Sequence, residues 1–545
     1  MKTKKSKGRV HTWGISQMWP ARILFVVLGL QLSQALESLN KQEKLTVNRS
    51  QKRPNFVILF ADDIGYGDLG ANRESPGESD TPFMDQLASK GTRFTDFHAG
   101  ASVCTPSRAA LLTGRLGKRT GVVKNFSLGS EGGLPLNETT FAETFKAAGY
   151  QTGMIGKWHL GHTGPFLPSN RGFDSYYGII ASADMGCADD PGYNIPTCPK
   201  CSNGSIKDSH PECVNQVGVP LYENSTIVEQ PANLVTLASR YVQHASDFIN
   251  KSVNDASPFV LYVAFAHTHV PLQTNPKFSN LSSRGPFGDV LRELDSTVAG
   301  IMTRIRDAGI ETDTLVWFTG DNGPWAVKCQ YAGDSGPFLG LWQKQKGGGG
   351  STAKQTVWEA GHREPTFVYW PGHVPAGRVS DSLLSALDIY PTIASIAGIP
   401  LPKYRSYDGM DISQVLYGKS LYNRTLFHPT NVRSAPQGEF DAIRSGSYKA
   451  VYRTGGAQQC GGLEGPILSH NPPLLFNVHK DPQESIPLDT SNRQYSDVLA
   501  GIEASRKSFD KDLQRDNTTV ADYRLSNKFF PCCNPKDVQC RCTWQ

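Results

Sequence analysis

The chain has 545 residues, 38% of them hydrophobic, which is more than one small core needs and predicts two or three domains. Its net charge of +5 is small for this length, and no long basic block follows the N-terminal segment, so nucleic-acid binding is not indicated. The mild positive charge is compatible with anionic substrates, although an ordinary protein surface explains it as well.

The N-terminus carries the features of a secretory signal peptide, which we place at residues 1–35. A basic start is followed by the apolar run ILFVVLGLQLSQA, which closes on small residues at Ser33 and Ala35. This run is shorter than the about 20 residues that span a bilayer, and no later apolar stretch is longer. We therefore expect a luminal or extracellular product with no membrane span; a transmembrane anchor is the less favoured alternative.

Glycosylation sequons are numerous, which agrees with a secretory route. They begin at Asn48, Asn125, Asn137, Asn203, Asn224, Asn250, Asn280, Asn423 and Asn517. A single sequon often occurs by chance, but nine behind a signal peptide carry more weight. We predict glycans at five of them, namely Asn125, Asn137, Asn224, Asn423 and Asn517.

The 11 cysteines are an odd number in an oxidising compartment, so at least one lies outside the internal disulfides. Two local clusters are predicted to be structural, with a zinc knuckle as the alternative for either. They are Cys187, Cys198, Cys201 and Cys213 in a loop, and Cys532, Cys533, Cys540 and Cys542 in the tail. Cys329 and Cys460 can then pair with each other across the domains, which leaves Cys104 over.

Four apolar segments along the chain read as buried strands that end in polar side chains. In chain order these segments are NFVILFADD, YQTGMIGKWH, PFVLYVAFAHTH and DTLVWFTGDNG, and the polar ends are Asp62 and Asp63, Lys157 and His159, His267 and His269, and Asp321 and Asn322. Helical patterns lie between them, so we predict an α/β domain with a mostly parallel sheet. In such sheets ligands bind beyond the carboxyl ends of the strands, where these polar ends would meet.

The composition changes near residue 425. FDAIRSGSYKAVYRTGG reads as two short strands joined by a Gly-Ser turn, and a charged helix follows around YSDVLAGIEASRKSFDKDLQ. We predict a large domain over 54–424 and a smaller α+β domain with an antiparallel sheet and a cysteine-rich tail over 425–545. The Gly-rich stretch QKQKGGGGSTAKQT is predicted to be a flexible loop. It lacks a Walker pattern, so a nucleotide-binding loop is not indicated.

The strand ends suggest a cation site. Asp62, Asp63, Asp321 and Asn322 offer oxygen ligands, which suit calcium or magnesium better than zinc. Asp62-Asp63 alone, or Asp321-Asn322 alone, is more often part of a turn or a helix cap. Two such pairs at strand ends favour a metal site. The i, i+2 spacing of Lys157 with His159, and of His267 with His269, places each pair on one face of an extended chain.

Cys104 stands at the start of a predicted helix, in SVCTPSRAALLTGR, with Thr105 as a candidate N-cap and Pro106 at the first helical position. The helix start and Arg108 favour an oxyanion beside it. A low-pKa thiolate nucleophile is one possible function. The cysteine phosphatase arrangement needs five residues between Cys and Arg, however, and here there are three.

CTPSRAALLTGR resembles the signature of the sulfatase family, in which this cysteine is converted to formylglycine (3-oxoalanine) in the endoplasmic reticulum. NFVILFADDIGYGDLG, GKWHLG, HTHVP, FTGDNGP, AKQTVWEAGHREP and PCCNPKDVQCRC extend the resemblance over nearly the whole chain after the signal, to the arylsulfatase A branch. The resemblance implies an alkaline phosphatase-like sulfatase fold, a single Ca²⁺ ion, and the formylglycine-generating enzyme as a partner during maturation.

The resemblance also implies roles for individual residues. Asp62, Asp63, Asp321, Asn322 and converted Cys104 match the calcium site, and Arg108, Lys157, His159, Ser182, His269 and Lys354 match the sulfate pocket. Ser182 lies in ASADMG, where the branch more often has Tyr-Ser-His-Asp, and the His is missing here. The implied mechanism has an aldehyde hydrate that attacks sulfur, with His269 protonating the leaving alcohol and His159 accepting the proton of the second hydroxyl. His267 is expected to be a supporting neighbour.

The implied substrate is a sulfated glycosaminoglycan, through resemblance to a lysosomal member of the branch: the glucosamine of heparan sulfate, at its 3-O-sulfate. The implied location is the lysosome, reached by the secretory pathway, with a secreted fraction. Two other functions compete with this hypothesis. They are a phosphatase or phosphodiesterase of the alkaline phosphatase superfamily, and an inactive glycan-binding relative.

Overall fold

The computed structural model describes residues 53–73, 78–198, 200–201, 217–420, 424–429, 431, 437–537 and 539–543. Its contacts separate Met1–Arg53 from one compact unit, Pro54–Gln545, which contains all the elements described below. The predicted signal peptide and the sequons at Asn48, Asn203 and Asn423 lie outside the described residues. Within the described part of the chain, no helix is long and apolar enough to cross a membrane.

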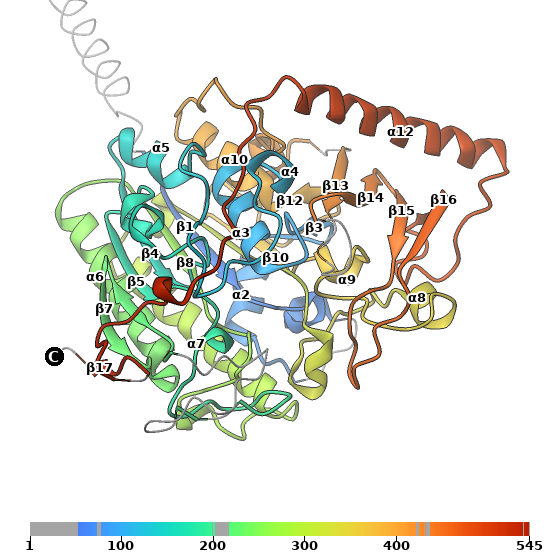
Figure 1. Ribbon diagram of the computed structural model, residues 1–545. Coiled ribbons are helices and arrows are strands. Elements are labelled where there is room, and N and C mark those ends of the chain that lie inside the picture. The colour runs from blue at the N-terminus through green and yellow to red at the C-terminus, as the bar shows by residue number, and fades with distance from the viewer. Residues whose placement is uncertain are drawn as a thin grey trace, which may run out of the picture. The chain divides into compact units, whose positions relative to one another are not determined.

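An 11-stranded mixed sheet organises this unit, in the order β11-β2-β10-β9-β1-β8-β4-β5-β6-β7-β17. Its central strands β9, β1, β8, β4 and β5 are parallel neighbours. β10, β6 and β17 run against the others, so the sheet is mixed but mostly parallel, as predicted. In Figure 1 these strands stand side by side, with α6 and α7 at one face and α3, α5 and α10 at the other.

The strands of the large sheet are β1 (Asn55–Ala61), β2 (Thr92–Phe94), β4 (Gln151–Gly156), β5 (Ser175–Ile179), β6 (Leu221–Glu223), β7 (Thr226–Gln230), β8 (Phe259–Ala264), β9 (Thr314–Gly320), β10 (Thr366–Tyr369), β11 (Arg378–Ser380) and β17 (Cys542–Thr543). β3 (Phe97–His98) and β12 (Leu384–Ser385) form a separate two-stranded pair. The helices before residue 425 are α2 (Pro82–Lys90), α3 (Cys104–Thr113), α4 (Gly117–Thr120), α5 (Phe141–Ala147), α6 (Leu237–Asn254), α7 (Pro286–Asp307), α8 (Leu341–Gln345), α9 (Glu359–His362), α10 (Ile389–Ile396) and α11 (Ser413–Leu416).

Alternation along β1 explains the two layers of the core. Phe56, Ile58 and Phe60 pack into one buried cluster with residues of α3, α5 and α10, while Val57 and Leu59 pack into another with residues of α6 and α7. All five side chains are fully buried. Because successive side chains of a strand point to opposite faces, a continuous apolar run is the sequence pattern of a strand covered by helices on both faces.

Helix α3 begins two residues earlier than predicted. Val103, and not Thr105, is the N-cap, and the helix ends at Gly114, whose φ of 67° is left-handed. The Thr105 hydroxyl donates to the carbonyl oxygen of His159 at 2.8 Å instead of capping, and its backbone N–H donates to Oδ1 of Asn125 at 3.0 Å. The polar groups of Thr105 are therefore used by neighbouring loops, and the first helical residue is Cys104.

The C-terminal region contains a small antiparallel sheet, as predicted. Its order is β13-β14-β15-β16, over β13 (Thr425–Pro429), β14 (Phe440–Ser445), β15 (Tyr448–Thr454) and β16 (Leu468–Asn477). The predicted Gly-Ser turn joins β14 to β15. Ile502 of α12 (Arg493–Leu513) packs in one buried cluster with side chains of this sheet. The domain boundary at residue 424 stays a prediction.

Disulfides account for the described cysteines other than Cys104. The cross-domain pair Cys329–Cys460 forms as predicted. The local clusters contain the pairs Cys187–Cys201, Cys532–Cys540 and Cys533–Cys542, and Cys198 is also disulfide-bonded. Disulfides in both clusters exclude the zinc-knuckle alternative, and Cys104 is the free cysteine of the described residues.

The Gly-rich stretch predicted as a flexible loop is held by specific contacts. A Cβ atom at Gly350 would lie 2.2 Å from the carbonyl oxygen of Glu464, and φ at Gly350 is 95°. The Ser351 backbone N–H donates to the Ala457 carbonyl oxygen at 2.8 Å. Glycine is needed here for close approach to the C-terminal region, and this contact positions the segment that carries Lys354.

Candidate active site

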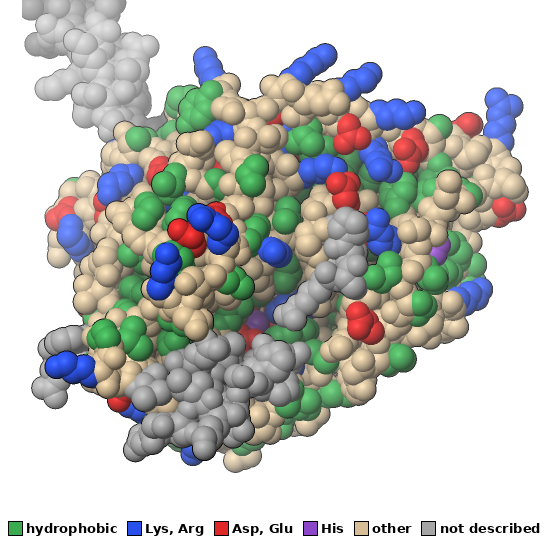
Figure 2. Space-filling view, viewed as in Figure 1, with side chains coloured by type: hydrophobic (Ala, Val, Ile, Leu, Met, Phe, Trp, Pro, Cys, Tyr) green, Lys and Arg blue, Asp and Glu red, His purple; other side chains and the backbone are tan. Residues whose placement is uncertain are grey.

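The polar ends of the predicted strands meet at one edge of the large sheet. β9, β1, β8 and β4 are neighbours in that order and end in register, with Ala61 opposite Gly320 and Gly156 opposite Ala264. The residues that follow these strands are therefore brought together, and α3 adds Cys104 and Arg108 from one face. In the space-filling view, charged side chains of both signs and a His side chain reach the surface together near the middle of the face (Figure 2).

Arg108 and Lys157 are held by two carboxylates at the base of the site. Nε and one terminal nitrogen of Arg108 donate to Oδ2 of Asp321 at 3.0 and 2.7 Å, and Lys157 Nζ lies 2.5 Å from Oδ2 of Asp62. Burial opposes both positive charges, but the carboxylates outweigh it and raise the pKa of Arg108 and of Lys157. Both side chains are therefore fixed cations.

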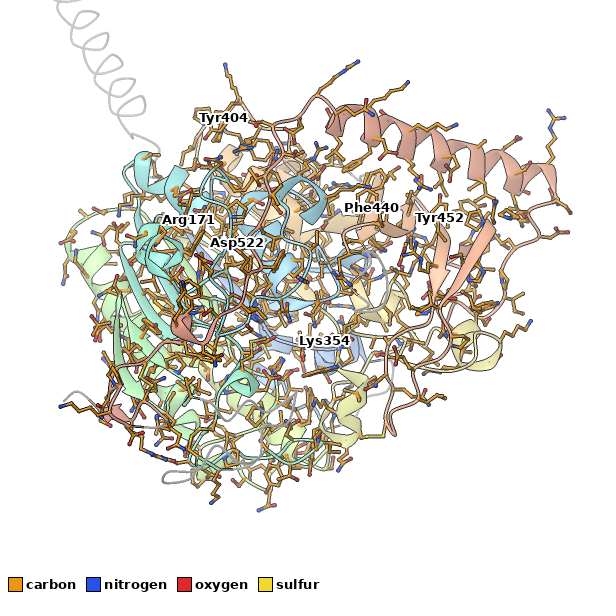
Figure 3. All side chains as sticks on the ribbon, in the orientation of Figure 1. Arg171, Lys354, Tyr404, Phe440, Tyr452 and Asp522 are labelled. Atoms are coloured by element: carbon orange, nitrogen blue, oxygen red, sulfur yellow. A yellow bond between two sulfur atoms is a disulfide. The ribbon has the colours of Figure 1, made fainter. Side chains whose placement is uncertain are left out.

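A second ion pair lies on the other side of the site. Lys354 Nζ donates to both oxygens of Asp63 at 2.6 and 2.7 Å, and Asn322 Nδ2 donates to Oδ1 of Asp63 at 2.7 Å. Burial opposes the charge of Lys354, but Asp63 raises its pKa above the usual value. Lys354 is labelled in Figure 3, where it lies in the interior of the molecule.

Ser182 connects the two sides. Its Oγ lies 2.6 Å from Lys157 Nζ and 3.5 Å from Nε2 of His269, which is itself 3.5 Å from Oδ2 of Asp63. Nδ1 of His269 donates to the Val270 carbonyl oxygen, so Nε2 is the nitrogen that faces the site. Burial lowers the pKa of His269 to about 4. Ser182 thus lies inside the pocket, although Ala183 replaces the histidine that more often follows this serine in the arylsulfatase A branch.

His159 is oriented by the loop that follows α4. Its Nε2 lies 3.0 Å from the Phe126 carbonyl oxygen, which can only accept, so Nε2 carries the hydrogen. Nδ1 is buried and has no hydrogen-bond partner. Burial, together with Lys157 and Arg108, holds the pKa of His159 well below its usual value. The ring is therefore a neutral base with a free lone pair on Nδ1.

Cys104 is fully buried among these groups, with its Sγ 3.7 Å from Oδ1 of Asp62. Burial raises the pKa of its thiol far above the usual value, and Lys157 and Lys354 only partly offset this. The thiol is therefore protonated over the physiological range. The burial of Cys104 therefore disfavours the low-pKa thiolate alternative.

One oxygen in the site is buried without a partner. Oδ1 of Asn322 makes no hydrogen bond, and it belongs to the same strand end as Asp321. Asp62, Asp63, Cys104 and His269 offer ligand atoms within 4.8 Å of one another. An unpartnered amide oxygen beside three carboxylates is the donor set of a hard cation, so the residues present fit a calcium-type ion.

Backbone strain coincides with the same residues. Asp63 and His159 have φ angles of 55° and 62°, in the left-handed region that residues other than glycine seldom adopt. Such conformations persist where the surrounding structure determines them, and they concentrate at functional sites. Asp63 and His159 lie shortly after the ends of β1 and β4, in the turns that also carry Asp62 and Lys157.

Every catalytic, substrate and metal residue predicted from sequence lies in this site, and His267 lies beside it. The carbonyl oxygen of His267 accepts the N–H of Asp62 at 2.7 Å, and a supporting role for the His267 side chain stays a prediction. Sequence reasoning missed the Phe126 carbonyl and Trp325, which packs against His269 with ring centroids 5.4 Å apart. The sequence feature that could have indicated Trp325 is its position, three residues after Asn322.

The predicted glycosylation sites differ in exposure. Asn137, Asn224 and Asn517 are exposed, which suits a glycan acceptor. Asn125 is half-buried, and its side chain holds the start of α3. Asn423 lies outside the described residues.

The family comparisons identify the class of hydrolase to which this fold and site belong. The Sulfatase family matches residues 54–399, and the family described as the C-terminal region of aryl-sulfatase matches residues 422–542. The chain therefore belongs to the sulfatase family, and it hydrolyses sulfate esters.

Among individual relatives, the chain is similar to arylsulfatase G of Canis lupus familiaris, with 51% identity over 91% of the chain and 92% of the relative. It is 39% identical to arylsulfatase A of Homo sapiens, over 90% of the chain and 95% of the relative. The solved structure of the PsFucS1 sulfatase from Pseudoalteromonas sp. superposes with a TM-score of 0.75 at 26% identity, covering 90% of this chain and 96% of that one. The resemblance to the arylsulfatase A branch is thus confirmed.

Proposed function

We propose that the protein is a formylglycine-dependent, calcium-dependent sulfatase of the lysosome that removes sulfate from a glycosaminoglycan. One observation carries the proposal: the free, buried Cys104 lies among three fixed cations, with its pKa raised by burial. A protonated thiol cannot attack sulfur, so its position in an anion pocket is understandable if the residue is converted to another nucleophile.

The cations of this chain bind the sulfuryl group. Arg108, Lys157 and Lys354 are each held by a carboxylate, so they neutralise charge on sulfuryl oxygens without having to reorganise. Asp62, Asp63, Asp321, Asn322 and converted Cys104 would hold the calcium ion. When bound, that ion supplies Lewis-acid stabilisation of the sulfuryl oxygens.

The two histidines have opposite protonation roles. His269 presents Nε2 beside Asp63 and Ser182, where its imidazolium form would protonate the leaving oxygen with Lys354 as a second donor. Because burial lowers the pKa of His269 to about 4, this form is populated at acidic pH. His159 presents its free Nδ1 lone pair and would accept a proton. The hydrate of the aldehyde supplies two hydroxyls on one carbon, one to receive sulfate and one to release it.

The maturation proposal is tested at position 104 itself. In the peptide that contains it, mass spectrometry is expected to show sulfur and two hydrogens replaced by one oxygen, the product of the formylglycine-generating enzyme. Cys104→Ser is expected to accept sulfate once and stall, because a serine ester lacks the second hydroxyl needed for elimination. Sustained turnover by the Ser variant, or an unmodified thiol in fully active protein, contradicts the proposal.

The substrate proposal rests on similarity to arylsulfatase G, and it names the glucosamine of heparan sulfate at its 3-O-sulfate. Defined sulfated oligosaccharides that differ in one sulfate position test it directly. Aryl sulfate and aryl phosphate, assayed side by side with metal analysis, separate it from a phosphatase or phosphodiesterase activity. An inactive glycan-binding protein would bind the oligosaccharides without releasing sulfate.

The lysosomal proposal predicts a glycosylated protein that reaches this compartment by the secretory pathway, with a secreted fraction. It rests on the predicted signal peptide, the sequons and the relatives. Co-localisation with a lysosomal marker and a mass shift on glycosidase treatment test it. A cytosolic, unglycosylated protein would contradict it.

A further inference from the structure

We propose that the surface around Arg405 binds the core sugars of the N-linked glycan attached to Asn137, with Tyr404 as the contact and the glycan of Asn517 beside it. This surface is separate from the active-site residues, and the inference rests on the secretory route proposed above. The evidence is the way in which two sequons, far apart in the chain, meet in the fold.

The sequons at Asn137 and Asn517 are adjacent in the structure. One terminal nitrogen of Arg405 donates to the carbonyl oxygen of Asn137, and the other donates to that of Asn517. The hydroxyl of Thr519, the third residue of the second sequon, donates to Oε1 of Glu138, the middle residue of the first, at 2.8 Å. Because one planar guanidinium binds both carbonyl oxygens, the two glycan acceptors lie side by side.

The two acceptors stand on a buried, charged base. Arg405 and Glu138 are buried, whereas the side chains of Asn137 and Asn517 are exposed. Nε of Arg115 lies 2.9 Å from Oε2 of Glu138, and a terminal nitrogen of Arg115 donates to the Asn517 carbonyl oxygen at 3.3 Å. The backbones of both sequons are therefore fixed, and only their side chains reach the surface.

Three exposed apolar side chains surround the acceptors. Leu136 is 54% exposed, Tyr404 61% and Val520 88%. Leu136 directly precedes Asn137, and Val520 directly follows the second sequon. Figure 3 shows Tyr404 at the edge of the molecule. Single exposed apolar side chains are common, but a group of them marks a surface that binds something.

Tyr404 is positioned beside the first acceptor. Its hydroxyl lies 2.8 Å from Oγ1 of Thr139, the third residue of the Asn137 sequon. The guanidinium of Arg405 lies 5.5 Å from the ring centre, and most of the tyrosine remains exposed. A glycan on Asn137 therefore begins next to an aromatic ring that a hydrogen bond already orients, so little conformational freedom is lost when a sugar packs on it.

Covalent attachment favours the protein's own glycan as the occupant of this surface. A sugar tethered beside the ring is present at a high effective concentration, so even a weak contact is populated. The face of a tyrosine ring is electron-rich and attracts the C–H groups that form the apolar face of a pyranose. N-acetylglucosamine, the sugar joined to asparagine in N-linked glycans, offers such a face.

A double-mutant cycle on the full-length glycoprotein tests the contact, after glycopeptide mass spectrometry has measured occupancy at Asn137. Asn137→Gln removes the glycan and is expected to raise the equilibrium constant of unfolding in urea about fivefold. In the Tyr404→Ala background the same change is expected to raise it less than about twofold. Tyr404→Phe keeps the ring, so Asn137→Gln is expected to cost as much there as in the wild type.

Asn224→Gln is the matched control, because Asn224 is an exposed sequon in the turn between β6 and β7. Its effect on unfolding is expected to be the same with Tyr404 and with Tyr404→Ala. Equal effects of Asn137→Gln in these two backgrounds would overturn the inference. Loss of the coupling in Tyr404→Phe would overturn it as well, because the hydrogen bond to Thr139 would then be responsible.

Two further outcomes identify what has failed. Self-association of the wild type that Tyr404→Ala abolishes, with no coupling in the cycle, would assign the surface to a second copy of the chain. An unoccupied Asn137 would overturn the inference alone, whereas the absence of glycans from every sequon would contradict the secretory route too. Sulfate ester turnover is measured in each variant and reports separately on the proposed activity.

Discussion

Two buried clusters of charged side chains can be compared directly, because each brings carboxylates, cations and a histidine within reach of one another. The edge cluster (Asp62, Asp63, Arg108, Lys157, His269, Asp321 and Lys354) lies at the carboxyl ends of the central strands. The seam cluster (Asp96, His98, Glu359, Arg363, Arg444, Lys449 and Glu484) lies between α9 and the small sheet. Ligand atoms of Asp96, His98 and Glu359 approach one another as closely as those of the edge cluster.

The carboxylates of the seam cluster are paired with buried cations. Asp96 already accepts from Arg363 at 2.7 Å and from Arg444 at 2.8 Å, and these cations hold its pKa far below the usual range although burial opposes this. The rings of His98, His428 and His362 are stacked, at centroid distances of 5.1 and 4.1 Å. Ring-nitrogen lone pairs lie in the ring plane, so parallel rings do not direct them at one ion.

The difference shows that buried charge alone does not mark an active site. Buried groups without a hydrogen-bond partner occur in both clusters, for example Nδ1 of His159 in the edge cluster and Nδ1 of His98 in the seam cluster. The edge cluster differs in that the free Cys104 lies among its cations. In the seam cluster, the carboxylates and cations form ion pairs with one another, and the pair of Lys449 with Glu359 links the C-terminal sheet to α9. Variants of the two clusters are therefore expected to lose different properties.

The largest expected effect is on turnover. Asp321→Asn removes the carboxylate that orients Arg108 and contributes to the proposed cation site, so sulfate ester hydrolysis is expected to fall about a thousandfold or more. Steady-state kinetics with an aryl sulfate, and circular dichroism to confirm folding, measure it. Asp381→Asn, at an exposed position, is the control. A folded Asp321→Asn enzyme with a tenth of normal turnover would contradict the proposed cage.

The next effect is on stability and belongs to the seam cluster. Lys449 Nζ lies 3.0 Å from Glu359 and 2.7 Å from Glu484, so Lys449→Met leaves two buried carboxylates facing each other. The free energy of unfolding is expected to fall by about 3 kcal/mol, measured by urea denaturation. Turnover per folded molecule is expected to stay within twofold. Lys480→Met, at an exposed position, should change neither quantity, and equal losses in both lysine variants would refute the distinction.

A buried carboxylate outside both clusters gives a pH-dependent effect. Asp295 accepts the backbone N–H groups of Phe83 and Met84 at the start of α2, and burial raises its pKa from 3.8 to about 6. A raised pKa stabilises the fold below pH 4, and this contribution is lost as the pH rises through 6. The wild type is expected to lose about 2 to 3 kcal/mol relative to Asp295→Asn between pH 4 and pH 7. Urea midpoints at several pH values measure this, and a constant difference would show that folding does not shift the pKa of Asp295.

The smallest expected effect is at a helix end far along the chain. Oδ1 of Asn492 accepts the N–H of Gln494 and caps α12. Asn492→Ala is expected to lower the free energy of unfolding by about 1 kcal/mol, and Asn492→Ser to lower it less. Thermal denaturation measures both, and turnover should not change. An unchanged melting temperature in the Ala variant would show that the cap contributes nothing to the packing of α12.

The sequence by itself determined the elements of the fold and the composition of the site. A continuous apolar run is enough to identify β1 as a strand buried on both faces. Successive side chains point to opposite faces, so each face presents apolar side chains to its own layer of the core. Polar residues directly after such runs predicted Asp62, Lys157, His269 and Asp321. Counting the cysteines predicted the Cys329–Cys460 pair and left Cys104 free.

Only the tertiary structure decided which groups face one another. The order β9-β1-β8-β4-β5, the Phe126 carbonyl that orients His159, and the position of Trp325 between Lys328 and Lys354 depend on segments far apart in the chain. The same holds for the start of α3, where the Asn125 amide and the His159 carbonyl bind Thr105. The periodicity of apolar residues in the sequence indicates which side of a helix or strand is buried. The partner of a buried polar group is determined by tertiary packing, because its hydrogen bonds must be satisfied.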